Sequence, residues 1–430
     1  MKVSIIPTEK SISRQFKERP IDRFARRLLL SKLRKIQRGS ITIIDKKDSI
    51  NFGKATEDYP LHATINVHHP RFYAYTVLGG SIGAAEAYID GLWSADDLTT
   101  VIRIMVLNQA VFKEMDSGWA RLMAPLHRFY HFLRRNTLQG SQDNIVAHYD
   151  LGNEFYRLFL DDTMTYSCGI FESKQSTLAD ASRAKYRRIC EKLELTSNDQ
   201  VVEIGTGWGG FAIFAAKHYG CRITTTTLSP AQHKLAAERI RQAGLEHKIT
   251  LLLKDYRHIE GRFDKLVSIE MIEAVGHQYL DTFFATCSRL LHQTGMMALQ
   301  AITIQDQEFE PYKRSVDFIN RYIFPGGCVP SVAAISTTIA RATDLKIFHL
   351  EDITPHYART LREWRQRFFS NIDEVRRMNF PDAFIRMWEY YLCYCEGGFT
   401  ERYIGDVQML LTKPLCRRAP LLPKLTDTSL

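Results

Sequence analysis

The chain has 430 residues, enough for two or three domains, and its hydrophobic and charged fractions of 45% and 24% are those of an ordinary soluble globular protein. No apolar run reaches the ~18–20 residues that span a bilayer, and the N-terminus lacks a signal-peptide apolar segment, so we expect a cytoplasmic location. The eight cysteines include no C-x-x-C pair, which favours reduced thiols over disulfides or a metal centre.

The net charge of +9 resides in residues 1–40, which hold twelve Lys or Arg and three acidic residues. Basic side chains there alternate with an apolar stripe at helical spacing, made of Ile21, Phe24, Leu28, Leu29, Leu33 and Ile36. A basic amphipathic helix suits the surface of an anionic phospholipid membrane, where each Lys or Arg contributes about 1 kcal/mol. This predicts a peripheral protein on the inner face of the membrane, although an ordinary domain helix with a charged outer face explains the pattern equally well. No binding motif accompanies the charge, so nucleic acid is not expected as a partner.

Residues 41–140 are expected to form a small α+β domain that docks on lipid. β-branched residues favour strands at 40–44 and 63–67, and residues 83–91 are typical of a short helix closed by glycine. A helical apolar pattern over 112–142 ends in a polar link at 139–142, where we place the domain boundary.

From about residue 180 the predicted strands and helices alternate, which indicates a doubly wound, mostly parallel sheet with helices on both faces. The expected strands span 200–204, 222–227, 249–253, 265–269, 296–302, 345–350 and 406–412. We therefore predict an α/β catalytic domain over 141–413, preceded by the smaller α+β domain and followed by a loosely ordered tail over 414–430.

A glycine-rich turn joins the first of these strands to a helix. Gly205, Gly207 and Gly210 satisfy G-x-G-x-x-G, and glycine lets the backbone approach a ligand closely at a helix N-terminus. NAD or FAD would require an acidic residue at the end of the second strand, but residues 224–229 contain none. Asp255, after the third strand, is positioned to accept a hydrogen bond from an adenine amino group. S-adenosylmethionine (SAM) is therefore the favoured cofactor.

Seven motifs occur in the order and with the spacing of one known family. They are HYDLGN at 148–153, MTYSC at 164–168, EIGTGWGG at 203–210, TLSPAQ at 227–232, IEAVGH at 272–277, YIFPGG at 322–327 and PHY at 355–357. In these motifs the chain resembles the cyclopropane-fatty-acyl-phospholipid synthases and the related mycolic acid cyclopropane synthases. The resemblance implies a SAM-dependent transferase of methyltransferase fold that adds a methylene bridge across a cis double bond of a phospholipid acyl chain. The family includes dimers, so a homodimer is among the expected assemblies.

The fold and the resemblance together predict a SAM-binding set spread over three strand ends. Tyr166 and Ser167 would lie on a lid segment, and Gly205, Gly207 and Gly209 in the loop. The remaining members are Thr227, Ser229 and Gln232 at the ribose and methionine end and Asp255 and Tyr256 beside the adenine.

The resemblance also implies a bound bicarbonate that deprotonates a carbocation. The matching positions for this catalytic set are Cys168, Glu273, Gln300, Ile302 and Tyr357. Gln300 departs from the family, which has histidine there, and an amide can donate to an anion but cannot carry a positive charge. Cys168 also fits an ordinary buried thiol, and Glu270 is interpreted as a structural residue that offsets a helix dipole. His148 and Asp150 are expected to order the loop over the cofactor.

Three other products or functions stay open. The same cation can be reduced or lose another proton, which gives a methylated or rearranged chain. Some plant amine N-methyltransferases resemble this family, and their chemistry needs no bicarbonate. A lipid-binding protein without catalysis is the third alternative, which the intact glycine loop disfavours.

Overall fold

The computed structural model describes residues 19–46, 48–111 and 151–421, and these divide into two compact units. Of the described residues, unit 1 contains those up to 111 together with Ser315–Ile323 and Trp364–Tyr403, and unit 2 contains the remainder. The sequence analysis instead kept all of 141–413 in one domain. The predicted link at 139–142, the pattern over 112–142, His148 and Asp150 lie outside the described residues.

Unit 1 is built on a four-stranded sheet with the order β2-β1-β3-β4. Its strands are β1 (Gly39–Asp45), β2 (Asp48–Lys54), β3 (His62–Val67) and β4 (Trp93–Ala95), and its N-terminal helices are α1 (Pro20–Leu33), α2 (Arg71–Ile89) and α3 (Leu98–Leu107). The helix predicted over 83–91 is longer than expected, because it begins at Arg71 and continues through a kink at Gly80, where φ is 58°.

The C-terminal helix α16 (Asp382–Thr400) belongs to unit 1 because it packs against α2 and α3. A Cβ at Gly397 would lie 2.7 Å from Ile102 Cγ2, so glycine permits the close approach to α3. The Tyr88 hydroxyl donates to Glu389 at 2.7 Å, which joins α2 to the same helix. The preceding α15 (Ile372–Arg377) and the short π-helical turn Ile319–Ile323 complete the unit.

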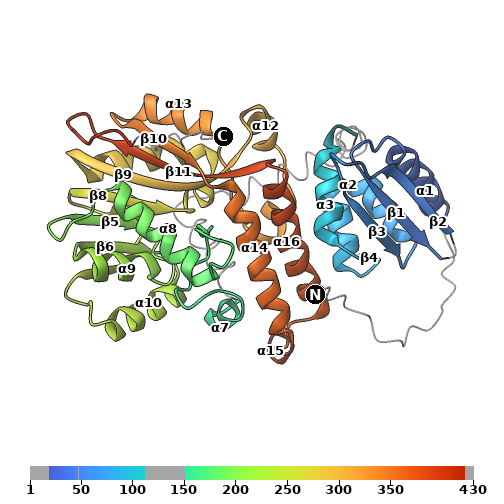
Figure 1. The fold of residues 1–430 in the computed structure, drawn as a ribbon, viewed down its shortest axis with the longest axis horizontal. Coiled ribbons are helices and arrows are strands. Elements are labelled where there is room, and N and C mark those ends of the chain that lie inside the picture. The colour runs from blue at the N-terminus through green and yellow to red at the C-terminus, as the bar shows by residue number, and fades with distance from the viewer. Residues whose placement is uncertain (1–18, 47, 112–150, 422–430) are drawn as a thin grey trace, which may run out of the picture. The chain divides into compact units, whose positions relative to one another are not determined.

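Unit 2 is a seven-stranded sheet with the order β10-β11-β9-β8-β5-β6-β7, in which β11 alone runs antiparallel to both neighbours (Figure 1). The strands are β5 (Gln200–Ile204), β6 (Arg222–Thr227), β7 (Ile249–Leu253), β8 (Phe263–Ile269), β9 (Leu291–Ile304), β10 (Lys346–Asp352) and β11 (Ile404–Thr412). The prediction of an α/β, mostly parallel sheet is confirmed, and every expected strand is present.

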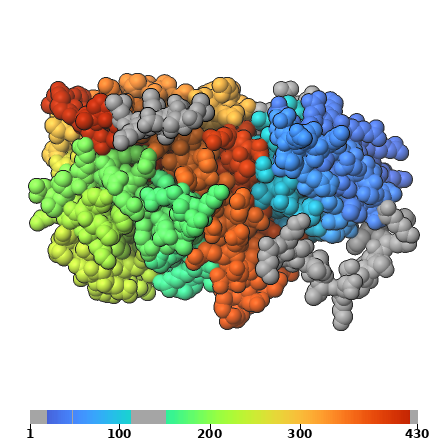
Figure 2. Space-filling view, in the orientation of Figure 1, coloured from blue at the N-terminus to red at the C-terminus, as the bar shows by residue number. Residues whose placement is uncertain are grey.

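Helices connect these strands. They are α7 (Asn153–Arg157), α8 (Leu178–Lys192), α9 (Gly210–Tyr219), α10 (Pro230–Gln242), α11 (Leu280–Leu290), α12 (Asp306–Tyr312), α13 (Val332–Ala342) and the start of α14 (Thr354–Ser370). Short 3-10 turns occupy Tyr256–His258, Ile272–Ala274 and His277–Tyr279. In the space-filling view, α9 and α10 form part of the surface of unit 2 (Figure 2).

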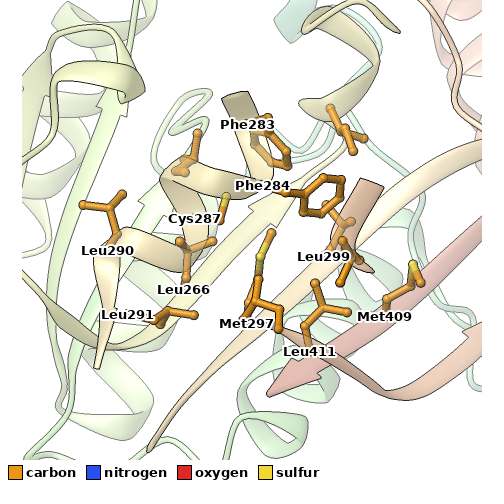
Figure 3. Packing of buried hydrophobic residues seen from close by; sticks show 14 of the residues in the cluster. Leu266, Phe283, Phe284, Cys287, Leu290, Leu291, Met297, Leu299, Met409 and Leu411 are labelled. Atoms are coloured by element: carbon orange, nitrogen blue, oxygen red, sulfur yellow. The ribbon is translucent and has the colours of Figure 1, made fainter. Parts of the chain in front are cut away.

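Both faces of the large sheet are buried, because consecutive strand residues enter opposite hydrophobic clusters. Leu266 packs in one cluster with Phe283, Phe284 and Leu290 of α11 (Figure 3). Its neighbour Val267 packs in the other cluster with residues of α8 and α9. Such burial produces near-continuous apolar strands and leaves the strand ends for polar side chains. Within the described residues, no helix has the length and apolar character needed to cross a membrane.

Candidate active site

The loop between β5 and α9 keeps three glycines in the left-handed region, with φ of 101° at Gly205, 52° at Gly207 and 84° at Gly209. A Cβ at Gly207 would meet no heavy atom of the described residues within 4 Å, so this position leaves space for a ligand. A Cβ at Gly210 would instead lie 2.5 Å from the Tyr186 hydroxyl. Gly210 is therefore required by packing, and contact of the other three glycines with SAM stays a prediction.

Side chains from distant segments hold this loop in place. Arg239 of α10 donates to the carbonyl oxygens of Trp208 at 2.7 Å and Thr163 at 2.9 Å. The Trp208 indole donates to Asn153 Oδ1 at 2.7 Å, and the Asn153 amide donates to the Ala231 carbonyl at 3.1 Å. These bonds join the start of α7, the segment before Tyr166 and the glycine loop.

The predicted ribose-binding residues form a helix cap. Ser229 is the N-cap of α10, and its hydroxyl accepts from the Gln232 backbone N–H at 3.2 Å. The Thr227 hydroxyl donates to Gln232 Oε1 at 2.8 Å and accepts from the Ser229 N–H at 3.1 Å. The cap explains why all three are buried, and their contact with SAM stays a prediction.

Asp255 follows β7, and its carboxylate accepts from the Arg257 guanidinium at 2.9 Å and 2.7 Å. Burial opposes ionisation, but the hydrogen bonds from Arg257 lower the pKa of Asp255 below its ordinary value. An ionised carboxylate keeps spare acceptor positions, which fits the predicted bond from an adenine amino group. The ring of Tyr256 packs against Phe283 with centroids 5.7 Å apart. Sequence reasoning did not identify Arg257.

The predicted lid residues lie in an aromatic and buried setting. The Tyr166 ring contacts Tyr156 and Phe159, with centroids 5.4 Å and 6.1 Å apart. The hydroxyl of Ser167 accepts from Lys185 Nζ at 2.5 Å. Lys185 is completely buried, and burial lowers the pKa of its ammonium group.

Three of the five predicted catalytic residues meet at Glu270. Its Oε1 accepts from the Cys168 backbone N–H at 2.8 Å and from Gln300 Nε2 at 2.7 Å, and its Oε2 accepts from the Tyr357 hydroxyl at 2.5 Å. Glu270 follows β8 with a φ of 47°, an uncommon conformation for a non-glycine residue. The helix-dipole interpretation of Glu270 is wrong, because its carboxylate faces these side chains and not a helix N-terminus.

The other two predicted residues form a second pair nearby. The Ile302 backbone N–H donates to Glu273 Oε1 at 2.5 Å. Glu273 Oε2 and Asp406 Oδ1 are buried and have no hydrogen-bond partner in the described part of the chain. Burial, reinforced by the neighbouring Glu270, raises the pKa of Glu273 to about 8, and the same two causes raise the pKa of Asp406 well above its ordinary value. Burial likewise raises the pKa of the Cys168 thiol.

Sequence reasoning missed two buried polar residues, Lys185 and Asp406, although the sequence contains a signal for each of them. Lys185 lies on the buried stripe of α8 with Leu178, Ala181 and Ile189, a position that helices seldom give to lysine. Asp406 stands two residues before Gln408 on the same side of a central strand, where apolar residues are expected. A buried charge on a core face indicates a polar site in the interior.

A doubly wound sheet with one reversed strand, a glycine turn after its first strand and an acid after its third define a SAM-dependent methyltransferase. The family model for mycolic acid cyclopropane synthetase matches residues 136–409. The chain belongs to this family and is a SAM-dependent methyltransferase of the cyclopropane-synthase type.

Two curated relatives cover most of the chain. A tuberculostearic acid methyltransferase of Mycobacterium tuberculosis is 36% identical over 362 residues, which is 82% of this chain and 84% of the relative. The cyclopropane-fatty-acyl-phospholipid synthase of Escherichia coli is 35% identical over 360 residues, which is 82% of this chain and 88% of that enzyme.

Solved structures agree with the fold. The mycolic acid cyclopropane synthase CmaA1, in complex with SAH and CTAB, matches with a TM-score of 0.59 and 30% identity over 63% of this chain and 98% of that one. The cyclopropane synthase MmaA2 of Mycobacterium tuberculosis matches with the same TM-score, 29% identity and the same coverage. Coclaurine N-methyltransferase is similar at a TM-score of 0.58 and 18% identity, over 76% of this chain and 98% of that one, which shows the fold alone.

Proposed function

We propose that this enzyme transfers the SAM methyl group to a cis double bond of an unsaturated phospholipid acyl chain and closes a cyclopropane ring. The observation that carries the proposal is the proximity of the glycine loop to the segment 270–273, which contains Glu270 and Glu273. A Cβ at Gly205 would lie 3.3 Å from the side chain of Met271, which stands between Glu270 and Glu273. A methyl group held at the loop would thus lie near buried carboxyl groups.

The alkene π electrons form the new C–CH₃ bond as the S–CH₃ bond breaks, which releases S-adenosylhomocysteine and leaves a cation on the second alkene carbon. Loss of a proton from the new methyl group lets its C–H electron pair close the ring. The burial of Cys168, Gln300 and the Oε2 atom of Glu273 supports this chemistry, because a dry site keeps water from the cation.

Bicarbonate, when bound, supplies the base that takes this proton. The oxygens of Glu273 and Asp406 that lack a partner among the described residues fit such an anion, because burial raises the pKa of both carboxyl groups, that of Glu273 to about 8, and so favours the protonated form that can donate. Glu273 and Asp406 would therefore hold the anion and orient it.

A methyl-branched product is the second candidate, and Gln300 favours it. The Gln300 amide donates to Glu270 and Asp406, but it cannot add a positive charge beside an anion as a histidine can. A weakly held base would leave the cation to lose a proton from a neighbouring carbon of the acyl chain, which gives a methyl-branched unsaturated chain.

The substitution Gln300→His is expected to raise the cyclopropane share of the lipid product by about threefold to tenfold, a difference of about 0.7–1.4 kcal/mol in competing barriers. The measurement is mass spectrometry of lipids, with the ring confirmed, from a host that lacks its own cyclopropane synthase. An unchanged or lower share would contradict the proposed role of position 300. A wild-type enzyme that leaves lipids unmodified but methylates amines would be an N-methyltransferase.

We also propose that α1 docks unit 1 on an anionic phospholipid surface. The predicted apolar stripe is divided: Leu29, Leu33 and Ile36 are buried in unit 1, whereas Phe24 is 62% and Ile21 45% exposed. The exposed basic residues Arg23 and Arg27 lie within one helical turn of this pair. Two exposed apolar side chains among basic ones suit insertion between anionic headgroups.

Replacing Ile21 and Phe24 together by serine is expected to weaken sedimentation with anionic vesicles by tenfold or more, because full burial of each side chain would contribute about 1.5–3 kcal/mol and tenfold corresponds to about 1.4 kcal/mol. Ile44→Ser and Leu78→Ser, also at exposed apolar positions of unit 1, serve as the matched control pair. Deletion of residues 1–40 is unsuitable, because it would remove core residues. Equal sedimentation of both double variants would reject docking through α1.

A further inference from the structure

A chain of buried hydrogen bonds leads from α8 through the centre of the large sheet to the candidate active site. Lys192 Nζ donates to Gln408 Oε1 at 2.8 Å, and Gln408 Nε2 donates to Gln300 Oε1 at 3.0 Å. Gln300 Nε2 then donates to Glu270 Oε1 at 2.7 Å and to Asp406 Oδ2 at 3.2 Å. We name Lys192, Gln408 and Gln300 the amide relay.

The antiparallel pairing of β9 with β11 fixes the inner part of this relay. Gln300 and Gln408 are directly opposite each other in the register, so their side chains lie on the same face of the sheet. Both are buried, with 1% and 2% of their surface exposed. Asp406, two residues along the same strand, lies on that face as well.

The chemistry of Lys192 gives the relay one direction. An ammonium group has donors only, so the Gln408 oxygen must face it and the Gln408 NH₂ group must face Gln300. The Gln300 oxygen must then accept, which leaves its NH₂ group directed at Glu270 and Asp406. Lys192 is itself held by Glu351 at 2.8 Å, and Glu351 also pairs with Arg188.

We infer that Lys192 and Gln408 are positioning residues that fix the orientation of the amide at position 300 and so decide that the active site receives a neutral hydrogen-bond donor there. The inference rests on the proposed function of this site. It also explains how glutamine takes a histidine position, because a neutral imidazole at 300 would likewise accept from Gln408 and donate to Glu270.

The isosteric substitution Gln408→Glu reverses the relay. A carboxylate at 408 accepts from Lys192 but has no proton for Gln300, so the Gln300 amide must rotate and direct its oxygen at Glu270. We expect turnover of SAM on vesicles of unsaturated phospholipid to fall at least tenfold, the melting temperature to fall, and the KM for SAM to stay within twofold. Asp344→Asn, which changes the charge beside the buried Lys413 but keeps an acceptor and lies outside the relay, is the matched control and should stay within twofold in turnover.

The double variant Gln300→His with Gln408→Glu provides a rescue that a general packing role would not give. A protonated imidazole at position 300 donates both to the carboxylate introduced at position 408 and to Glu270, so donation toward Glu270 is restored. We expect the double variant to recover at least half of the lost melting temperature and at least threefold in turnover over Gln408→Glu.

Two outcomes would overturn the inference: a Gln408→Glu enzyme that matches the wild type in turnover and melting temperature, or a double variant with no recovery in either. Failure of the proposed function has a different signature. A wild-type enzyme that modifies no unsaturated lipid would reject that function, while the coupling of positions 300 and 408 in melting temperature would still test the relay.

Discussion

The variant Gly207→Val is expected to lose SAM affinity by about 100-fold, or about 2.8 kcal/mol at 1.4 kcal/mol per tenfold. Gly207 has a φ of 52° and open space around its missing Cβ, so a valine side chain would project into the volume left for the cofactor. The same substitution also strains the backbone by about 1–2 kcal/mol, which lowers stability independently of binding.

Gly244→Val is the matched control, because Gly244 has a φ of 66° and no neighbour within 4 Å among the described residues. The melting temperatures of both variants should fall by similar amounts, but only Gly207→Val should weaken SAM binding in a calorimetric titration. Equal SAM affinities for the two variants would show that Gly207 does not face the cofactor. Gly210→Ala should instead unfold more readily than either, because its Cβ would lie 2.9 Å from the Thr163 carbonyl oxygen.

The substitution Glu273→Gln is expected to lower turnover by about 10²–10³-fold, the range seen when one preorganised catalytic group is removed. An amide keeps the acceptor for the Ile302 N–H and can still donate to an anion, but it cannot exchange a proton, so the variant removes only the labile carboxyl proton of Glu273. Glu389→Gln, at a largely enclosed carboxyl of unit 1 that accepts from Tyr88, is the control for loss of a carboxyl group in general. Comparable turnover of the two variants would exclude Glu273 from the reaction.

Stability gives a second readout for Glu273. The folded protein holds a proton on Glu273 up to a pKa of about 8, whereas the unfolded chain releases it near the ordinary glutamate pKa of 4.5. Wild-type stability should therefore fall as pH rises from about 4.5 to 8, and Glu273→Gln should make this fall less steep. A residual slope is expected, because burial also raises the pKa of Glu203 to about 8. Melting curves between pH 5 and 9 measure this, and parallel curves would contradict the buried, protonated state.

The strands of unit 2 and their alternation with helices could be predicted from short-range patterns in the sequence, namely apolar runs and the positions of glycines. The run 200–204 marks a strand buried on both faces, the apolar run 249–253 marks the edge strand β7, and the glycines after β5 mark a turn with positive φ. Helix α2 was predicted too short because Gly79 and Gly80 interrupt its pattern, although the structure passes them with a kink.

The sequence by itself determined the methyltransferase class, the family and the position of the glycine loop, because each depends on residues close together in the chain. Only the tertiary structure decided that Glu270 gathers Cys168, Gln300 and Tyr357, and that α16 packs with α2 and α3 in unit 1. The physical reason is sequence separation: Gln300 and Gln408 are 108 residues apart, and strand register alone brings them into contact. A local pattern records which residues are buried, but not which distant residue shares their hydrogen bonds.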